Sequence, residues 1–439
     1  MSSSTIAQTY TPYEFANLPQ KETLVNAFRG RPLNTLRTPA VVIDRSVFAK
    51  NCARMHANAR EWGAGFRAHV KTHKTAEGVR LQLQSSADQT TAIVVSTLME
   101  AWEVVKAGLV ADGTVKDILY GLPVAPNKIA DLANLRDVLV SNGGVVRVLV
   151  DNPDQVKYLE EFESQRENPQ LWSVFVKVDP GAKRAGLEPS SPYFEALLTT
   201  VFTSSAVSVH GFYTHAGQSY ASTSLTEASS FLSREVDAVN TAAGLALSLL
   251  KGTPGTAPRD SPFVLAVGAT PTAHAATAET RDKLASLLNG TLELHAGNYP
   301  LLDLQQIHTS LVDDKRVAQR VLATVISYYA DRGAGGTDEA MCDAGALAMS
   351  KDTGPSGTFG EIIGTGWRLG RISQEHGTLT QDVASGQPLT PLKVGDVVPI
   401  VGQHACLTLA AYSWYYIVDS EGESGGQLVE DVWVPWKGW

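Results

Sequence analysis

Cysteine is scarce in this chain: three thiols, Cys52, Cys342 and Cys406, stand among 439 residues. They form no even framework and no tight pair, which indicates a reducing compartment and leaves each thiol free for packing or chemistry.

Positive charge is scarce as well. Lys and Arg number 36 against 45 Asp and Glu, a net charge of −9, with no long basic run. We therefore expect small-molecule ligands, and neither nucleic acid nor a membrane as a partner.

Long apolar runs are also missing. The longest, such as VVRVLV at 145–150, are strand-sized and shorter than the ~20 residues that a membrane-spanning helix needs. The opening MSSSTIAQTYTPYEFA has no basic segment followed by an apolar one and no Arg-rich pattern. We therefore expect no secretory or transit signal and a cytoplasmic protein. The length predicts two domains, or one large barrel with an appendage.

Short β-branched runs alternate with helical patterns from about residue 38 to 310. Many of these runs end in a small or polar residue, such as Asp151, Asp179 or Gly268. Strands buried on both faces have this form when functional groups lie at their C-terminal ends. The pattern favours the α/β class and a (β/α)8 TIM-type barrel. The runs lie at 40–44, 92–96, 145–151, 173–179, 209–215, 263–268 and 292–297.

Helical periodicity largely disappears after about residue 312, where Gly-rich turns separate apolar runs. This change predicts a C-terminal antiparallel β-domain. We expect the barrel over 36–312 and the β-domain from 1–35 together with 313–439. The Pro- and Gly-rich segment 254–262 is expected to be a connection within the barrel.

A cluster of cationic side chains, RAHVKTHKT at 67–75, follows an apparent strand. Alone, such a segment is usually a solvated loop. A lysine near the start of a barrel can instead lie inside it, where burial and neighbouring cations favour the neutral amine that forms a Schiff base with an aldehyde. Together with TPAVVIDRSVFAKNCARM at 38–55, the segment resembles the alanine-racemase-like, fold-type III pyridoxal-phosphate enzymes. The similarity is greatest to the branch of D-serine dehydratase and D-threonine aldolase. The resemblance implies that Lys71 binds the cofactor covalently and that Lys74 does not.

The resemblance also gives roles to side chains that follow later strands. Arg184, in VKVDPGAKRAGL at 176–187, is by itself typical of a surface arginine, but the resemblance implies that it approaches the phenolic oxygen of the cofactor. GFYTHAGQSY places Tyr213, His215 and Tyr220 at another strand end. By resemblance, His215 lies against the pyridine ring and a tyrosine faces the ring nitrogen. The sequence does not decide which tyrosine this is.

A cofactor phosphate needs backbone N–H groups and hydroxyls, which Gly-rich turns supply. Two such segments, VGATPTA at 267–273 and HAGNYPLLDLQQ at 295–306, follow late strands, where phosphate sites of this barrel gather. The cofactor-binding candidates here are Gly268, Thr270, Gly297, Asn298 and Tyr299.

VGQHACLTL at 401–409 places His404 and Cys406 two residues apart, so in a strand both side chains would project from one face. Imidazole and thiolate together suit zinc, and two protein ligands leave open positions for catalysis. Alone, an H-x-C pair is usually packing. In the dehydratase branch that the chain resembles, however, this pair binds zinc, whereas aldolases carry an acid at the second position. Cys406 therefore favours dehydration, and Cys52 and Cys342 are expected to be packing residues.

Residues and resemblance together predict a zinc- and pyridoxal-phosphate-dependent lyase. It would eliminate water from D-serine, giving pyruvate and ammonia; turnover of D-threonine is left open. An aldolase that forms glycine and an aldehyde is the first alternative, and a non-catalytic pyridoxal-phosphate protein is the second. The β-domain counts against the second, and plain racemisation ranks lower. The resemblance implies a homodimer. Asp343 and His376 could reach the pocket, but no role is assigned to them.

Overall fold

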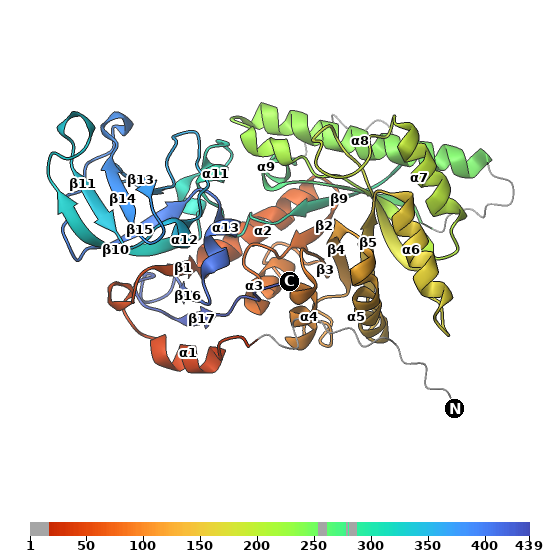
Figure 1. Ribbon diagram of the computed structural model, residues 1–439, viewed down its shortest axis with the longest axis horizontal. Helices are drawn as coiled ribbons and strands as arrows, with labels where there is room; N and C mark the ends of the chain where they lie inside the picture. Colours follow the sequence, from red (N-terminus) through yellow and green to blue (C-terminus); the bar gives the residue numbers. More distant parts are fainter. Residues whose placement is uncertain (1–16, 253–260, 278–279, 281–287) are drawn as a thin grey trace.

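The structure, a computed structural model, describes residues 17–252, 261–277, 280 and 288–439. Eight parallel strands close into a barrel in chain order, and helices surround it (Figure 1). The barrel strands are β2 (Gly65–His69), β3 (Ala92–Val95), β4 (Asp117–Pro123), β5 (Val145–Val150), β6 (Trp172–Lys177), β7 (Val207–Tyr213), β8 (Phe263–Val267) and β9 (Gly290–Ala296). The predicted TIM-type barrel is confirmed.

Several helices of the barrel begin where polar side chains cap them. Thr75 and Thr97 accept hydrogen bonds from backbone N–H groups in the first turns of α3 and α4, and Asn152 and Ser191 do the same for α6 and α7. Each cap satisfies a donor that the helix itself leaves unpaired. These helices are α2 (Arg45–Glu61), α3 (Ala76–Leu83), α4 (Leu98–Lys106), α5 (Ile129–Ser141), α6 (Pro153–Ser164), α7 (Pro192–Thr203), α8 (Leu225–Gly252) and α9 (Thr270–His274).

A nine-stranded sheet forms the second domain, beside the barrel (Figure 1). Its order is β11-β14-β13-β12-β15-β10-β1-β16-β17, and β11 also pairs with β10. All its pairs are antiparallel except that of β1 with β16. The strands are β1 (Ala40–Asp44), β10 (Gln319–Tyr329), β11 (Glu339–Cys342), β12 (Gly360–Ile362), β13 (Trp367–Ile372), β14 (Gly377–Gln381), β15 (Val397–Gly402), β16 (Tyr415–Val418) and β17 (Asp431–Trp433).

One predicted barrel strand lies elsewhere. The run 40–44 is β1, and it pairs with β10 and β16 of the second domain. All five of its residues are buried, so its apolar pattern is that of a strand buried on both faces, whichever sheet holds it. The barrel instead begins at β2, and it also includes β4, which the predicted set of runs lacked. The division of the chain at residues 36 and 312 stays a prediction.

The N-terminal arm lies against the second domain. Its helix α1 (Lys21–Phe28) places Lys21 in ion pairs with Glu77 and Asp431. Gly30 N–H donates to the carbonyl of Val429 (2.7 Å).

No helix among the described residues is long and apolar enough to span a bilayer. Most of the segment predicted as a connection at 254–262 lies outside the described residues.

Candidate active site

A cavity opens at the C-terminal ends of the barrel strands. Its lining comes from the ends of β2 to β7, so residues far apart in the sequence meet there. It includes Lys71, Lys177, Arg184, Tyr213 and His215. Four of these are predicted site residues, whereas Lys177 was not predicted.

Lys71 lies two residues beyond the end of β2. Its side chain passes next to Gly297, where an added Cβ would lie 3.5 Å from Lys71 Cε and 3.2 Å from His69 Cβ. Lys74 points elsewhere, to the buried carboxylate of Glu100 (3.1 Å). Of the two lysines, Lys71 is therefore the one that presents its amine to the cavity.

Lys177, the last residue of β6, is a second amine in the cavity and is 7% exposed. Its Nζ lies 3.9 Å from the centroid of the Tyr213 ring, within the range of a cation–π contact. Burial lowers the pKa of Lys177 to about 7, although the carboxylate of Glu235 opposes this shift. The position of Lys177 at the end of the buried run 173–177 is the sequence signal that could have identified it, because such runs rarely hold an unpaired charge.

Behind Tyr213 lies a polar network inside the barrel. The rings of Tyr213 and His295 are 4.9 Å apart between centroids. His295 Nε2 lies 2.7 Å from Glu293, whose carboxylate binds the buried guanidinium of Arg67 (2.8 Å), and Arg67 also binds Asp117 (2.7 Å). Burial raises the pKa of Tyr213, so its hydroxyl stays protonated.

Two carboxylates bind the backbone of the turn that carries Arg184. Asp179 Oδ1 accepts hydrogen bonds from three successive N–H groups, those of residues 181, 182 and 183 (2.7–3.1 Å). Asp151 Oδ2 accepts another from Gly186 N–H (3.0 Å). Gly186 has φ +99, and an added Cβ would lie 2.7 Å from the carbonyl carbon of Val178. The turn therefore requires glycine at this position and aims Arg184 at the cavity.

His215 lies where the loops after β7 and β8 meet. Its Nδ1 is 3.1 Å from the carbonyl oxygen of Gly268. Burial, together with Lys177 and Lys71, lowers the pKa of His215 to about 3, so the imidazole is neutral. A neutral ring with Nδ1 donating to that carbonyl leaves Nε2 as an acceptor.

The predicted phosphate residues are brought together only in part. Asn298 N–H donates to Thr270 Oγ1 (3.2 Å), which joins the turns after β8 and β9, and the hydroxyl of Tyr220 also hydrogen-bonds Thr270. Tyr299 lies apart from them: its hydroxyl accepts from Gln82 (3.2 Å), and its ring packs on Phe66. The side chain of Tyr299 thus lies between β2 and α3 and does not line the cavity.

The metal pair is not on a strand, contrary to our prediction. β15 ends at Gly402, His404 caps the short helix α13 (Ala405–Thr408), and Cys406 lies in its first turn. The cause is Asp303, whose carboxylate accepts from Ala405 N–H (2.7 Å) and turns the chain. The side chains of His404 and Cys406 nevertheless hydrogen-bond each other.

The surroundings of the pair connect it to both the barrel and the β-domain. Cys406 Sγ lies 3.1 Å from the hydroxyl of Thr72, next to Lys71, and His404 Nδ1 lies 3.1 Å from Asp352. Although burial opposes the shift, Cys406 raises the pKa of His404 to about 9. His404 and Tyr220 line a second cavity of about 520 Å³. Across the described ranges, no group of three or more His, Cys, Asp and Glu side chains could hold a metal.

Other predicted residues lie away from both cavities. Asp343 accepts hydrogen bonds from the side chain of Thr38 and from Thr324 N–H (2.7 Å), within the β-domain. His376 is exposed on the loop before β14. Neither of them lines a cavity next to Lys71 in this chain. Cys52 and Cys342 are buried, as predicted.

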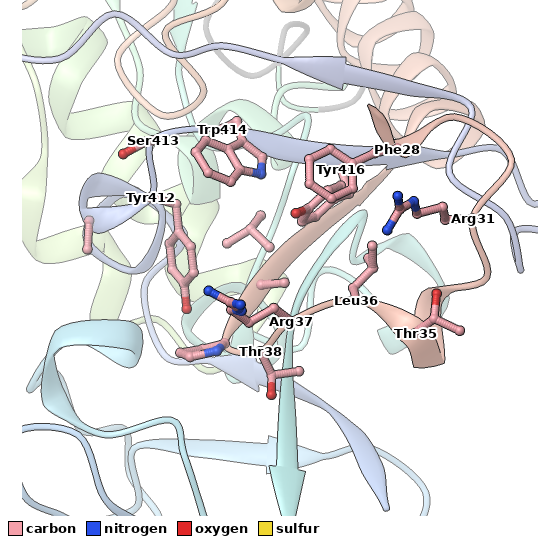
Figure 2. A pocket seen from close by; sticks show the side chains of 14 residues that line it. Phe28, Arg31, Thr35, Leu36, Arg37, Thr38, Tyr412, Ser413, Trp414 and Tyr416 are labelled. Carbon is pink, nitrogen blue, oxygen red and sulfur yellow. The ribbon is translucent and has the colours of Figure 1, made fainter. Parts of the chain in front are cut away.

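A cavity of about 710 Å³, larger than the one beside Lys71, lies between the N-terminal arm and β16. Figure 2 shows aromatic side chains of Phe28, Trp414 and Tyr416 on one side of it, with Arg31 and Arg37 nearby. Its lining residues include none of the predicted site residues. Size alone therefore does not locate the reactive groups.

Comparisons with known proteins agree with this architecture. Residues 43–252 match the family model described as "Alanine racemase, N-terminal domain", and residues 318–418 match "Putative serine dehydratase domain". D-serine dehydratase from Schizosaccharomyces pombe is 42% identical, covering 95% of this chain and 96% of the relative. The Saccharomyces cerevisiae D-serine dehydratase is 37% identical, covering 95% and 99%. Among solved structures, D-threo-3-hydroxyaspartate dehydratase from Delftia sp. HT23 has a TM-score of 0.75 at 29% identity, covering 93% and 100%. The chain belongs to the D-serine dehydratase family of alanine-racemase-like proteins.

Proposed function

We propose that this chain is a pyridoxal 5′-phosphate-dependent lyase that eliminates water from D-serine, giving pyruvate and ammonia. The observation that carries the proposal is 42% identity, over 95% of the chain, to a D-serine dehydratase. We further infer that zinc assists the reaction and that the enzyme acts as a cytoplasmic homodimer on small D-amino acids.

The cavity has the donors that pyridoxal 5′-phosphate requires. Lys71 offers an amine for the aldehyde carbon, and Gly297 leaves free the space that a Cβ would fill beside it. Arg184 would bind the phenolic oxygen, and the turns of Thr270 and Asn298 would bind the phosphate. Bound there, the cofactor supplies an electron sink for negative charge that develops at the substrate Cα.

The side chains of the cavity divide the remaining tasks. During turnover, Lys71 Nζ removes the proton from the substrate Cα. The phenol of Tyr213, kept protonated by burial, would offer the pyridine nitrogen an uncharged partner. A neutral His215 would pack on the ring without adding a positive charge.

The donor chemistry of His404 and Cys406 fits zinc. Asp352 at Nδ1 of His404 orients the imidazole, and zinc would take the place of the hydrogen bond between His404 and Cys406. Two protein ligands leave positions open for water or for the β-hydroxyl of the substrate. Zinc held by this pair would stabilise the departing hydroxide as a Lewis acid.

The test is a D-serine assay coupled to pyruvate detection, with and without a chelator. We expect pyruvate, and we expect its rate to fall when the metal is removed and to recover with zinc. Lys71→Ala should abolish both activity and the visible absorbance of bound cofactor, whereas Lys74→Ala should keep that absorbance. Glycine and an aldehyde from D-threonine, without pyruvate from D-serine, would establish the aldolase alternative instead.

A further inference from the structure

A carboxylate behind the cavity joins the two loops that follow β7 and β8. Glu235, on α8, is fully buried. Its Oε1 accepts hydrogen bonds from Ala216 N–H (2.7 Å) and from Gly268 N–H (3.3 Å). A single oxygen atom therefore bridges the backbones of both loops. Nothing in the local sequence of the long helix α8 indicates this role.

The bridge lies where the barrel no longer fixes the spacing of these loops. The paired register of β7 and β8 ends at Tyr213 and Ala266, and one further backbone bond, from Thr214 N–H to the carbonyl of Ala266 (3.0 Å), follows. Beyond that point no ladder joins the two backbones in the described segments. Immediately after the ladder ends, the side chain of Glu235 joins the two backbones instead.

The same bridge sets the position of two cofactor-binding candidates. Ala216 directly follows His215, whose ring in turn binds the carbonyl of Gly268 (3.1 Å). Gly268 lies two residues before Thr270 and has φ +128; an added Cβ there would be 2.2 Å from the carbonyl oxygen of His295. The Gly268 backbone thus lies tightly against β9, and the hydrogen bonds of Glu235 hold the loop of His215 next to it.

A carboxylate is a costly way to fill this space. Burial raises the pKa of Glu235 to about 7, because ionised groups lose their hydration inside a protein. An apolar side chain would avoid this penalty but would leave the two N–H groups without their acceptor. The energetic penalty has a reason if the two N–H groups must be held at a fixed separation.

We propose that Glu235 is a positioning residue that fixes the spacing between His215 and the Thr270 turn and thereby sets the affinity for pyridoxal 5′-phosphate. The inference rests on the proposed function only in that this cofactor binds the cavity. It requires that the acceptor oxygen and the length of the side chain matter, whereas the charge does not.

The experiment compares cofactor binding by variants of the full chain. The dissociation constant of pyridoxal 5′-phosphate is measured by fluorescence titration of cofactor-free protein, without substrate. E235Q keeps an acceptor oxygen at the same reach and should stay within about threefold of the natural protein. E235D, one methylene shorter, cannot reach both N–H groups and should bind about tenfold or more weakly. E235M, of similar length but without an acceptor, should behave like E235D. Asp237→Asn, on the exposed side of the same helix, is the matched control and should leave the constant unchanged.

Thermal unfolding of each cofactor-free variant establishes that it is folded, and two weakening variants keep the test open if one of them is not. Unchanged affinity in a folded E235D or E235M would overturn the inference, as would a folded E235Q that binds as weakly as E235M. Tight cofactor binding without pyruvate from D-serine would instead refute the proposed function and leave this inference standing.

Discussion

Gly297 controls the room available to Lys71, so Gly297→Ala is a direct perturbation of the reactive amine. The new Cβ would lie 3.2 Å from His69 Cβ and 3.5 Å from Lys71 Cε. The tight contact is the one with His69 Cβ, which is anchored at the end of β2, whereas Lys71 Cε would be at ordinary van der Waals distance. We therefore expect the Gly297 turn to shift away from β2 and to crowd the space beside Lys71. Overpacking by one methyl group typically costs about 1–3 kcal/mol, which corresponds to roughly 5- to 150-fold weaker cofactor binding if this space must be restored on binding.

The assay is a titration of cofactor-free protein with pyridoxal 5′-phosphate, followed by kcat on D-serine. Gly65→Ala is the matched control: it lies in the same barrel, and its added Cβ would meet its nearest neighbours at ordinary distances of 3.8 and 3.9 Å. Gly65→Ala should bind the cofactor like the natural protein. If Gly297→Ala also binds within about twofold of the natural protein, the proposed crowding of Lys71 is refuted.

Other perturbations test the buried charges and the metal pair. Arg67→Met removes the guanidinium that Asp117 and Glu293 share and leaves them only Arg147 and His295 as partners, so it should lower the free energy of unfolding by about 3 kcal/mol; a loss below about 1 kcal/mol in urea unfolding would contradict this. Glu235 has a pKa raised from 4.5 to about 7 in the folded chain, so its stabilising contribution is present below pH 4.5 and lost as the pH rises through 7. E235Q does not titrate, so its stability relative to the natural protein should increase by up to about 3 kcal/mol across that window, and a pH-independent difference would contradict the shift. Cys406→Ser should remove bound zinc, measured by mass spectrometry, while the absorbance of bound cofactor remains; Cys342→Ala, a buried cysteine of the β-domain, should keep the metal.

Most of the barrel could be predicted from apolar runs, and the two strands that were missed have short, interrupted ones. In β2, Arg67 separates Phe66 from Ala68, and in β4, Gly121 and Pro123 interrupt the pattern after three apolar residues. A buried charge alone does not hide a strand, because β5 and β9 carry Arg147 and Glu293 and were predicted nevertheless. β1 was predicted as a strand but assigned to the wrong sheet, because a fully buried strand has the same apolar pattern in either sheet.

The same distinction separates the predicted from the unpredicted residues of the site. Lys71, Arg184 and His215 belong to short local motifs, and all three line the cavity. Lys177 lies in the segment 176–187 but was given no role there, and Glu235 belongs to no motif; the roles of both depend on what packs around them. The metal pair was predicted from its spacing together with the resemblance. Its strand was wrong, because the chain there forms a helix whose first N–H group binds a carboxylate about a hundred residues earlier.

That carboxylate, Asp303, joins the predicted site residues of the two domains. Its Oδ2 accepts from Ala405 N–H (2.7 Å), at the metal pair, and from the side-chain amide of Asn298 (2.6 Å). The backbone N–H of Asn298 in turn binds Thr270 (3.2 Å). The predicted phosphate turns and the predicted zinc pair are therefore joined through one buried side chain. Because Asp303 follows the last barrel strand and Ala405 follows β15, neither the barrel nor the β-domain contains this junction alone. The register between the predicted phosphate turns and the predicted zinc pair is then a property of how the two domains pack.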